Sequence, residues 1–429
     1  MAVDQTRPSY YQATCNDTTR HPRLEGSQKA DVVVVGAGYT GLSAALELAE
    51  AGYDVAVVEA ETVGYGASGR NGGHVCPDYN KSMAHLTKAL GQDGARIAWE
   101  LGNETTRLVG ERVRKYGIDC DLKWGYLHAA ERRGHVPELH EMAEEAAHWG
   151  YDGMRVIEGE ELRSRLGTTR YHAALEDPRG GHLHPLNYCK GLARAAVAAG
   201  ARIYEESRVL ALDTGEKSGG NVSVTTADGS VEADFMVLAG NAYLQETVPF
   251  LYRRLMPVGS YIVATEPLGD NMARELIRED EAVGNMNFIV DYYRLSADRR
   301  MLYGGRATYS GIEPRDLASF VLPRMTGVFP QLKDSRIDYA WGGNIGITVD
   351  RMPHVGRIGT RCYFSQGYSG HGLALSNLCG KLISEAIRGQ NERFDTLAAV
   401  RHPIFPGGRF RTPLLSLGML WYRLKDALA

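Results

Sequence analysis

The segment DVVVVGAGYTGLSAALELAEAGYDVAVVEA, residues 31–60, decides the fold of this chain. Its first five residues are rich in β-branched side chains and too few for a helix, as in a buried parallel strand. Gly36–Gly41 form a glycine-rich turn, and residues 42–50 place apolar side chains on one face of a helix. Residues 55–58 form a second apolar run that ends at the acidic Glu59. This order predicts a βαβ unit that binds a dinucleotide.

Each special position in this unit has a physical reason. Gly36 allows the tight turn, Gly38 lets the backbone approach a diphosphate, and Gly41 lets the helix pack closely on the strand. The helix N-terminus attracts phosphates, and Glu59 can accept hydrogen bonds from a ribose diol. An ordinary glycine-rich turn of an α/β protein is the alternative. The predicted cofactor-binding residues here are Gly36, Gly38, Tyr39, Thr40, Gly41, Glu59 and Ala60.

A second glycine-rich segment, GYGASGRNGG at residues 64–73, follows the acid. A nicotinamide dehydrogenase needs no such loop at this point, whereas a flavin nucleotide is longer and needs further cover for its phosphates. The segment therefore favours FAD over NAD, with a flexible surface loop as the alternative. The residues predicted to contact FAD are Ala67, Ser68, Gly69, Arg70, Asn71, Gly72 and Gly73.

Together the two segments resemble the FAD-dependent D-amino-acid oxidase superfamily, and within it the bacterial γ-glutamylputrescine oxidases. The resemblance continues along nearly the whole chain, in GHLHPLN at 181–187, AGNAYL at 239–244, DYYRLSADRRMLYGG at 291–305, QGYSGHG at 366–372 and FPGGR at 405–409. It implies an α/β fold in which a Rossmann-like FAD-binding domain is interleaved with an α+β substrate domain that carries a mixed or antiparallel sheet. It also implies that Val209 meets the adenine and that the strand ending at Gly240 lies by the FAD.

The domains are expected to be discontinuous in sequence. Strand-like alternation at 258–265, 288–295 and 301–305 predicts the second sheet. The expected ranges are an N-terminal surface arm at 1–29, an FAD-binding domain at 30–82, 156–245 and 338–392, a substrate domain at 83–155 and 246–337, and a C-terminal extension at 393–429. Residues 410–428 are apolar on one side and are expected to dock on the body of the protein.

The late glycine-rich turn Gln366–Gly372 opens a predicted helix. A helix N-terminus after such a turn is an anion site, and here the anion would be the pyrimidine end of the reduced flavin. A plain strand–turn–helix is the alternative. The predicted contacts are Gly370, His371, Gly372 and Leu373.

The expected chemistry is oxidation of an amine, in which a C–H bond next to nitrogen breaks and a hydride passes to the flavin. Tyr261, Tyr292 and Tyr293 are candidate walls that would desolvate the amine and keep it neutral, with packing in the core, the commoner fate of strand tyrosines, as the alternative. Arg294 is a candidate partner for a distant substrate carboxylate, although a surface strand arginine is the alternative. The predicted catalytic residues are Tyr261, Tyr292, Arg294 and His371.

Two departures from the resembled superfamily refine this expectation. The sarcosine oxidases place a carboxylate-binding lysine two positions after the SGHG motif, where this chain has Leu373 and Ala374. The departure favours a γ-glutamylated polyamine, oxidised to an aldehyde with release of ammonia and H2O2. Gly342-Gly343 replace the cysteine that holds flavin in those oxidases, and no histidine stands in residues 67–71. FAD is therefore expected to be non-covalent, with His74 as the nearby residue that leaves this open.

Other functions remain open from the sequence alone. They are an N-methyl or cyclic amino-acid oxidase or dehydrogenase, an NAD-dependent dehydrogenase, and a flavin-holding protein without turnover. The electron acceptor would be O2 or another carrier.

Composition excludes several classes of partner. The net charge is −4 without a basic block, so nucleic acid is not an expected partner. The 6 cysteines lack paired spacing, which argues against a metal site and indicates the cytoplasm. No run approaches the roughly 18 apolar residues of a membrane span.

Overall fold

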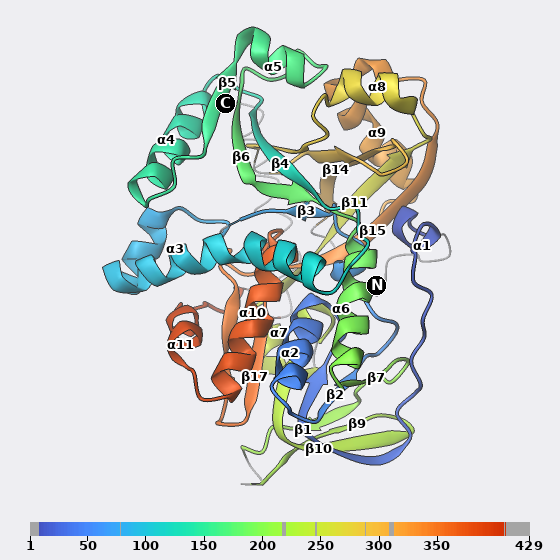
Figure 1. The fold of residues 1–429 in the computed structure, drawn as a ribbon, viewed down its shortest axis with the longest axis vertical. Helices are drawn as coiled ribbons and strands as arrows, with labels where there is room; N and C mark the ends of the chain where they lie inside the picture. Colours follow the sequence, from blue (N-terminus) through green and yellow to red (C-terminus); the bar gives the residue numbers. More distant parts are fainter. Residues whose placement is uncertain are drawn as a thin grey trace.

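Two β-sheets form the body of the protein. The computed structural model describes residues 8–77, 79–216, 220–244, 247–287, 289–308, 313–406 and 408. In Figure 1 the two sheets lie one above the other, and the long helix α3 (Met83–Lys115) runs across the molecule between them. The predicted mixture of parallel and antiparallel pairing in an α/β fold is confirmed.

The first sheet contains the dinucleotide-binding unit. Its strand order is β16-β17-β10-β1-β2-β7, with β8 and β9 added beside β10. Its strands are β1 (Gly26–Val35), β2 (Val55–Val58), β7 (Arg202–Tyr204), β8 (Ala211–Asp213), β9 (Val222–Thr225), β10 (Gly229–Leu238), β16 (His354–Ile358) and β17 (Cys362–Gln366). Helices α2 (Tyr39–Glu50), α6 (Pro185–Ala198) and α10 (Gly372–Ile387) stand side by side on one face (Figure 1).

The central strand β1 is buried on both faces, which explains its unbroken valines. Val32 and Val34 share a core with α2, whereas Val33 packs on the opposite side of the sheet. Gly36 has φ +107°, a conformation that L side chains rarely adopt, and a Cβ on Gly41 would lie 1.9 Å from the Gly36 carbonyl oxygen. Both glycines are therefore required by the turn, as the sequence predicts.

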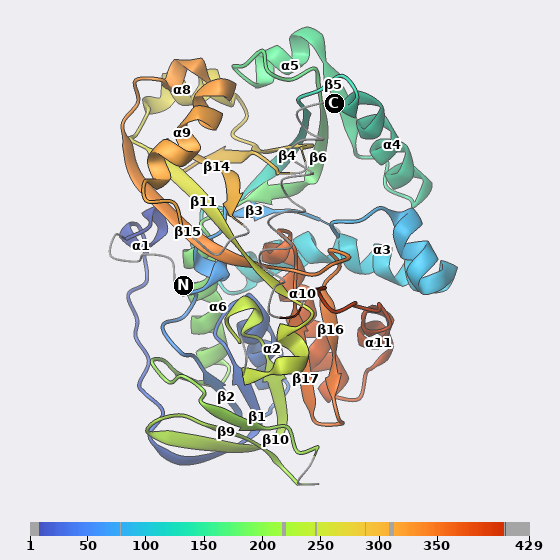
Figure 2. The ribbon, with the colours of Figure 1, turned by 180° about the vertical axis from the view of Figure 1, so that it is seen from behind.

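The second sheet lies over the first. Its strand order is β15-β11-β14-β13-β12-β4-β6-β3, with β5 beside β6. Its strands are β3 (His74–Val75), β4 (Lys123–Ala130), β5 (Arg155–Glu158), β6 (Ala173–His182), β11 (Met256–Thr265), β12 (Ala282–Asn285), β13 (Tyr292–Leu295), β14 (Met301–Thr308) and β15 (Ile337–Ile347). Seen from behind in Figure 2, β11 and β15 run diagonally across the molecule, beside α8 (Gly269–Leu276) and α9 (Leu317–Val328).

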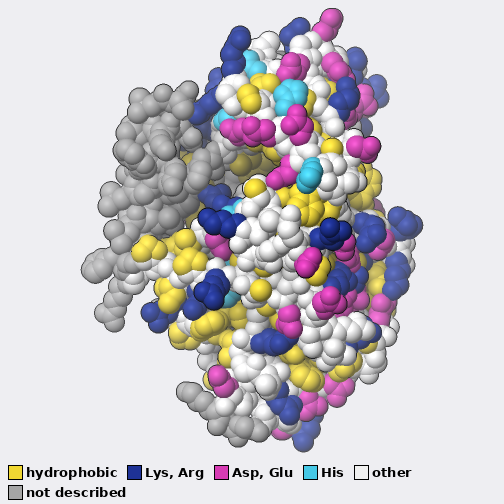
Figure 3. Space-filling model, turned by 90° about the vertical axis from the view of Figure 1, so that its left-hand side faces the viewer, with side chains coloured by type: hydrophobic (Ala, Val, Ile, Leu, Met, Phe, Trp, Pro, Cys, Tyr) yellow, Lys and Arg dark blue, Asp and Glu magenta, His cyan; other side chains and the backbone are white. Residues whose placement is uncertain are grey.

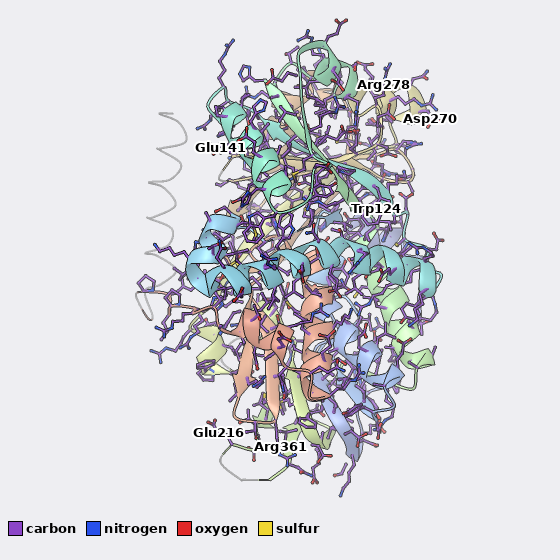
Figure 4. The ribbon with its side chains drawn as sticks, turned by 60° about the vertical axis from the view of Figure 1, so that its left-hand side comes forward. Trp124, Glu141, Glu216, Asp270, Arg278 and Arg361 are labelled. Carbon is purple, nitrogen blue, oxygen red and sulfur yellow. The ribbon has the colours of Figure 1, made fainter. Side chains whose placement is uncertain are left out.

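The remaining described helices are short or peripheral. They are α1 (Tyr10–Ala13), α4 (His135–His148), α5 (Gly159–Arg165), α7 (Pro249–Tyr252) and α11 (Glu392–Ala398), with 3-10 turns at Ala67–Gly69, Asn241–Tyr243 and Pro330–Leu332. Figure 4 shows Glu141 on the outer side of α4 and Trp124 beside α3. No helix in the described part of the chain is long and apolar enough to cross a membrane.

Strand pairing divides the chain differently from the predicted ranges. β5, β6 and β15 all pair within the second sheet, although the ranges 156–245 and 338–392 were expected in the FAD-binding domain. β15 is held there because it pairs with β11 along almost its whole length. Helix α3, expected in the substrate domain, shares its core with α10 and α2 of the first sheet. The division of the chain into an FAD-binding domain and a substrate domain that fold as separate units remains a proposal.

Most of the described N-terminal arm, residues 8–29, is exposed as expected, but its aromatic pair is not. Tyr10 and Tyr11 are buried, and Tyr11 packs edge-on against Trp341 at 5.2 Å and His184 at 5.0 Å. Tyr10 and Tyr11 are buried because they fill the space between α6 and the second sheet. The expected docking of residues 410–428 falls outside the described residues.

The contact between α2 and α10 offers a direct test of the fold. A Cβ on Gly380 would lie 2.4 Å from the Thr40 carbonyl oxygen, so Gly380→Ala must push the two helices apart. We expect it to lower the free energy of unfolding by about 1–3 kcal/mol, measured by denaturant unfolding. The matched control is Gly327→Ala in α9, because an added Cβ there meets nothing within 4 Å. We expect this control to leave the free energy of unfolding unchanged or to raise it slightly. Equal destabilisation by both variants would contradict this packing.

Candidate active site

A single cleft runs between the two sheets and brings together the three predicted glycine-rich segments. The cavity has a volume of about 400 Å³. Residues from Gly36–Thr40, Ala67–Gly72 and Gly370–Leu373 all line it, together with strands of the second sheet. Two segments near the start of the chain and a third about three hundred residues later therefore share one site.

One end of the cleft is built from the first glycine-rich turn and the end of β2. Glu59 lines it, and its carboxylate oxygens accept hydrogen bonds from the Ala37 N–H at 2.7 Å and the Glu61 N–H at 3.0 Å. Burial raises the pKa of Glu59. Ala60, Val209 and Gly240 line the cleft as well, as the resemblance implies for the last two. This end presents an acid and backbone groups, which suits a ribose and its base.

The second glycine-rich loop is tied to the first. Ser68 Oγ accepts a hydrogen bond from the Tyr39 N–H at 3.0 Å, at the start of α2. Asn71 acts mainly inside the loop, because its amide donates to the Ala67 and Ser68 carbonyls at 2.9 and 3.0 Å. Arg70 lines the cleft, but it is buried and donates to the Tyr65 carbonyl at 3.0 Å. The loop is thus held by hydrogen bonds of its own and by one to the start of α2.

Two helices open on the cleft with uncapped N-termini. Gly38 precedes α2 and His371 precedes α10, and neither forms a side-chain cap. His371 Nδ1 is buried without a hydrogen-bond partner in the described part of the structure. Burial, with smaller effects of His128 and Arg351, lowers the pKa of His371 to about 4. A neutral imidazole and the N-termini of two helices therefore face the same space.

The other end of the cleft is aromatic. His74 lies edge-on to Tyr126 and to Tyr292, with both ring centroids 5.5 Å away. Burial, assisted by the charge of Arg294, lowers the pKa of His74 to about 3, and its Nε2 atom is buried without a partner among the described residues. Burial raises the pKa of Tyr292 to about 12. All three side chains are therefore uncharged near neutral pH.

The charges that line the cleft are unevenly distributed. Among the described residues, the acids of the lining are Glu59 and Glu61, both at the end formed by β2. Arg351 also lines the cleft, and its charge acts on His371 near the aromatic end. Arg306 on β14 lines the cleft too, with its guanidinium 5.1 Å from the centre of the Phe320 ring. An ammonium ion would find no carboxylate in the described lining of the aromatic end.

The structure places two predicted catalytic residues outside the cleft. Tyr261 is buried in the core of the second sheet, and its hydroxyl pairs with Thr308 Oγ1 at 2.7 Å. Tyr293, the other candidate wall, is fully buried in the same core. Arg294 is 2% exposed and donates to the Gly72 and Leu295 carbonyls. The expectations for Tyr261 and Arg294 are corrected by these positions, because their polar groups are satisfied within the protein.

Tyr292 and His371 are the predicted catalytic residues that line the cleft. Gly41, Gly69 and Gly73 do not line it, and they shape the turns instead. The sequence analysis missed several lining residues at the aromatic end, which are Cys76, Tyr126, Ser260, Ile262, Arg306 and Arg351. The alternation of polar and apolar residues in the second sheet was the available signal, but it does not say which face meets the cofactor.

The site fits a long anionic nucleotide. Backbone N–H groups at two helix N-termini can hold phosphate or a negatively charged ring, and the unpartnered His371 Nδ1 is a polar group that a ligand can satisfy. No cluster of metal-ligating side chains occurs among the described residues. Fold and site together define a flavin-nucleotide-binding oxidoreductase.

Comparison with known proteins identifies the family. The family model described as FAD dependent oxidoreductase matches residues 31–386, and the chain belongs to this family. Its cofactor is accordingly FAD. The chain is 42% identical to the γ-glutamylputrescine oxidoreductase of Escherichia coli strain K12. The alignment spans 422 residues and covers 98% of each chain. The chain is 40% identical to the probable oxidoreductase OrdL of Haemophilus influenzae, over 97% of each chain.

Solved structures show the same fold at lower identity. Glycine oxidase from Geobacillus kaustophilus superposes with a TM-score of 0.74 at 22% identity, over 88% of this chain and 100% of that chain. L-proline dehydrogenase from P. horikoshii gives a TM-score of 0.71 at 21% identity, over 87% of this chain and 96% of that chain. These likenesses support the architecture described above.

Proposed function

We propose that this chain oxidises the terminal amine of a γ-glutamylated polyamine, such as γ-glutamylputrescine, with FAD as the oxidant. The observation that carries the proposal is the 42% identity to a γ-glutamylputrescine oxidoreductase over 98% of both chains. The reaction removes a hydride, which carries two electrons, from the carbon next to nitrogen and a proton from the nitrogen, and so leaves an imine. Water then converts the imine to an aldehyde and ammonia.

The cleft supplies a place for each part of FAD. The first glycine-rich turn and the N-terminus of α2 would hold the diphosphate, and Glu59 would accept hydrogen bonds from the adenosine ribose. The N-terminus of α10 at His371 would face the ring system. When bound, FAD supplies the acceptor for the hydride, which carries both electrons.

The protein's own contribution at the aromatic end is to orient the amine and keep it neutral. An ammonium has no lone pair to assist loss of the hydride. His74, Tyr126 and Tyr292 are uncharged and remove water from this end of the cleft, which lowers the pKa of a bound amine. Tyr292 keeps its predicted place as an aromatic wall of this site.

The substrate carboxylate would bind away from the reacting carbon. Leu373 and Ala374 are apolar and buried at the start of α10, where a carboxylate-binding lysine would be expected for an amino-acid substrate. Arg294 is not available for a distant carboxylate, because its donors are used within the protein. Arg306 and Arg351 line the cleft, and they replace Arg294 as candidate partners for the substrate carboxylate.

The wider setting of the enzyme is also part of the proposal. Electrons would pass from the reduced cofactor to O2, giving H2O2, or to another acceptor. The described cysteines are all unpaired, which supports a cytoplasmic location. Acidic and basic side chains are interspersed on the face shown in Figure 3, which supports a small-molecule substrate over nucleic acid.

We expect the FAD to be held without a covalent bond. Gly343 lines the cleft and offers no side chain for attachment, and residues 67–71 contain no histidine or cysteine. His74 and Cys76 also line the cleft, so the expectation needs a test. Acid precipitation should leave a colourless pellet and a yellow supernatant. A pellet that stays yellow in the wild type and turns colourless in His74→Ala or Cys76→Ala would show attachment at that residue.

The substrate assignment is tested by reducing the flavin without oxygen. We expect γ-glutamylputrescine to bleach the flavin at least about ten times faster, at equal concentration, than free putrescine, because putrescine lacks the γ-glutamyl group and its carboxylate. Sarcosine, proline and pipecolate serve as controls for N-methyl and cyclic amino-acid oxidation. Faster bleaching by any of these three, or equal rates with free putrescine, would overturn the proposed substrate.

A further inference from the structure

Arg294 is a buried cation whose partners are not carboxylates. Its Nε donates to the Gly72 carbonyl at 2.7 Å, its Nη1 to the Leu295 carbonyl at 3.0 Å, and its Nη2 to the Tyr11 hydroxyl at 3.2 Å. The side chain is 2% exposed. No ion pair among the described residues includes Arg294, and Asp298, an acid in this region, pairs with Arg300. A buried charge without a counter-ion is costly, so it calls for a function.

The guanidinium lies directly behind the second glycine-rich loop. A Cβ on Gly73 would lie 2.8 Å from Nη2 and 2.9 Å from Nε of Arg294. A Cβ on Gly72 would lie 2.7 Å from the ring of Tyr292, which shares a strand face with Arg294. Gly72, which lines the cleft, is thus held between these two side chains.

The same loop is supported by the N-terminal arm and by β15. Tyr11 accepts the hydrogen bond from Arg294 and packs edge-on against Trp341. Trp341 in turn donates from its indole nitrogen to the Arg70 carbonyl at 3.0 Å. Two buried donors therefore fix carbonyls at both ends of the segment from Arg70 to Gly72.

The positive charge of Arg294 reaches the aromatic end of the cleft. It contributes, after burial, to the lowered pKa of both His74 and His184, each to about 3. His74 lines the cleft, so the field of Arg294 acts where a cofactor ring would lie. A negative charge that forms in this space on reduction would be stabilised by the same field.

We propose that Arg294 is a positioning residue with a fixed charge: it anchors the Gly72 carbonyl and raises the reduction potential of the bound FAD. The inference rests on FAD binding, which the family establishes, and is independent of the proposed substrate. The charge of Arg294, which forms no ion pair with any described acid, would find its counter-charge in the reduced cofactor.

The first test compares midpoint potentials of the FAD-loaded wild type and Arg294→Gln. Loss of the charge should weaken binding of reduced relative to oxidised FAD by about tenfold, which corresponds to about 30 mV for two electrons. The matched control is Arg112→Gln, which removes another buried arginine that does not line the cleft and is paired with Glu47. We expect the control to leave the potential unchanged even where it lowers stability. Equal potentials in wild type and a folded, FAD-loaded Arg294→Gln would overturn the proposal.

The second test uses Arg294→Lys, which keeps a cation but places a titratable one in a buried site. A lysine buried without a carboxylate has a lowered pKa, so its charge disappears as the pH rises. The potential of this variant should match the wild type at low pH and fall below it as the pH increases. A difference in midpoint potential between Arg294→Lys and the wild type that stays the same at every pH would contradict the proposal. This test can decide the matter even if Arg294→Gln does not bind FAD. Neither readout uses substrate, so failure of the substrate assignment leaves both interpretable.

Discussion

The hydrogen bond from the Tyr39 N–H to Ser68 Oγ joins the two glycine-rich loops on which the site depends. It sets the distance between the start of α2 and the second loop, and a Cβ on Gly38 would collide with Ser68 Oγ at 2.8 Å. The two loops therefore approach closely at Gly38, and the side chains of Ser68 and Asn71 hold them in this arrangement. The N-terminus of α10 then completes this cradle from a segment about three hundred residues later in the chain.

The second sheet gives this cradle its chemistry. It closes the cleft with uncharged aromatic side chains, and it places Arg294 behind the loop. Two features of this sheet would act together in the proposed reaction: an aromatic end with no carboxylate in its described lining, and a positive charge near the expected place of the flavin ring. The first disfavours the ammonium form of the substrate, and the second favours the reduced form of the cofactor.

The βαβ unit was predictable because its signals are local. A tight turn needs glycine at Gly36 whatever the rest of the chain does. The aromatic end was not predictable in the same way. Tyr292 and Tyr293 are adjacent on β13, yet one lines the cleft and the other fills the core. A single sequence identifies the strand but not the face that meets the cofactor, and the burial of Tyr11 depends on long-range packing in the same manner.

Hydrogen exchange tests the central claim, that three separated backbone segments hold one FAD, most directly. Amide exchange would be compared between FAD-loaded protein and protein freed of FAD, over residues 36–42, 66–73 and 370–376. The account predicts that FAD slows exchange in all three segments together. Protection confined to residues 36–42, with the other two segments unchanged, would contradict it.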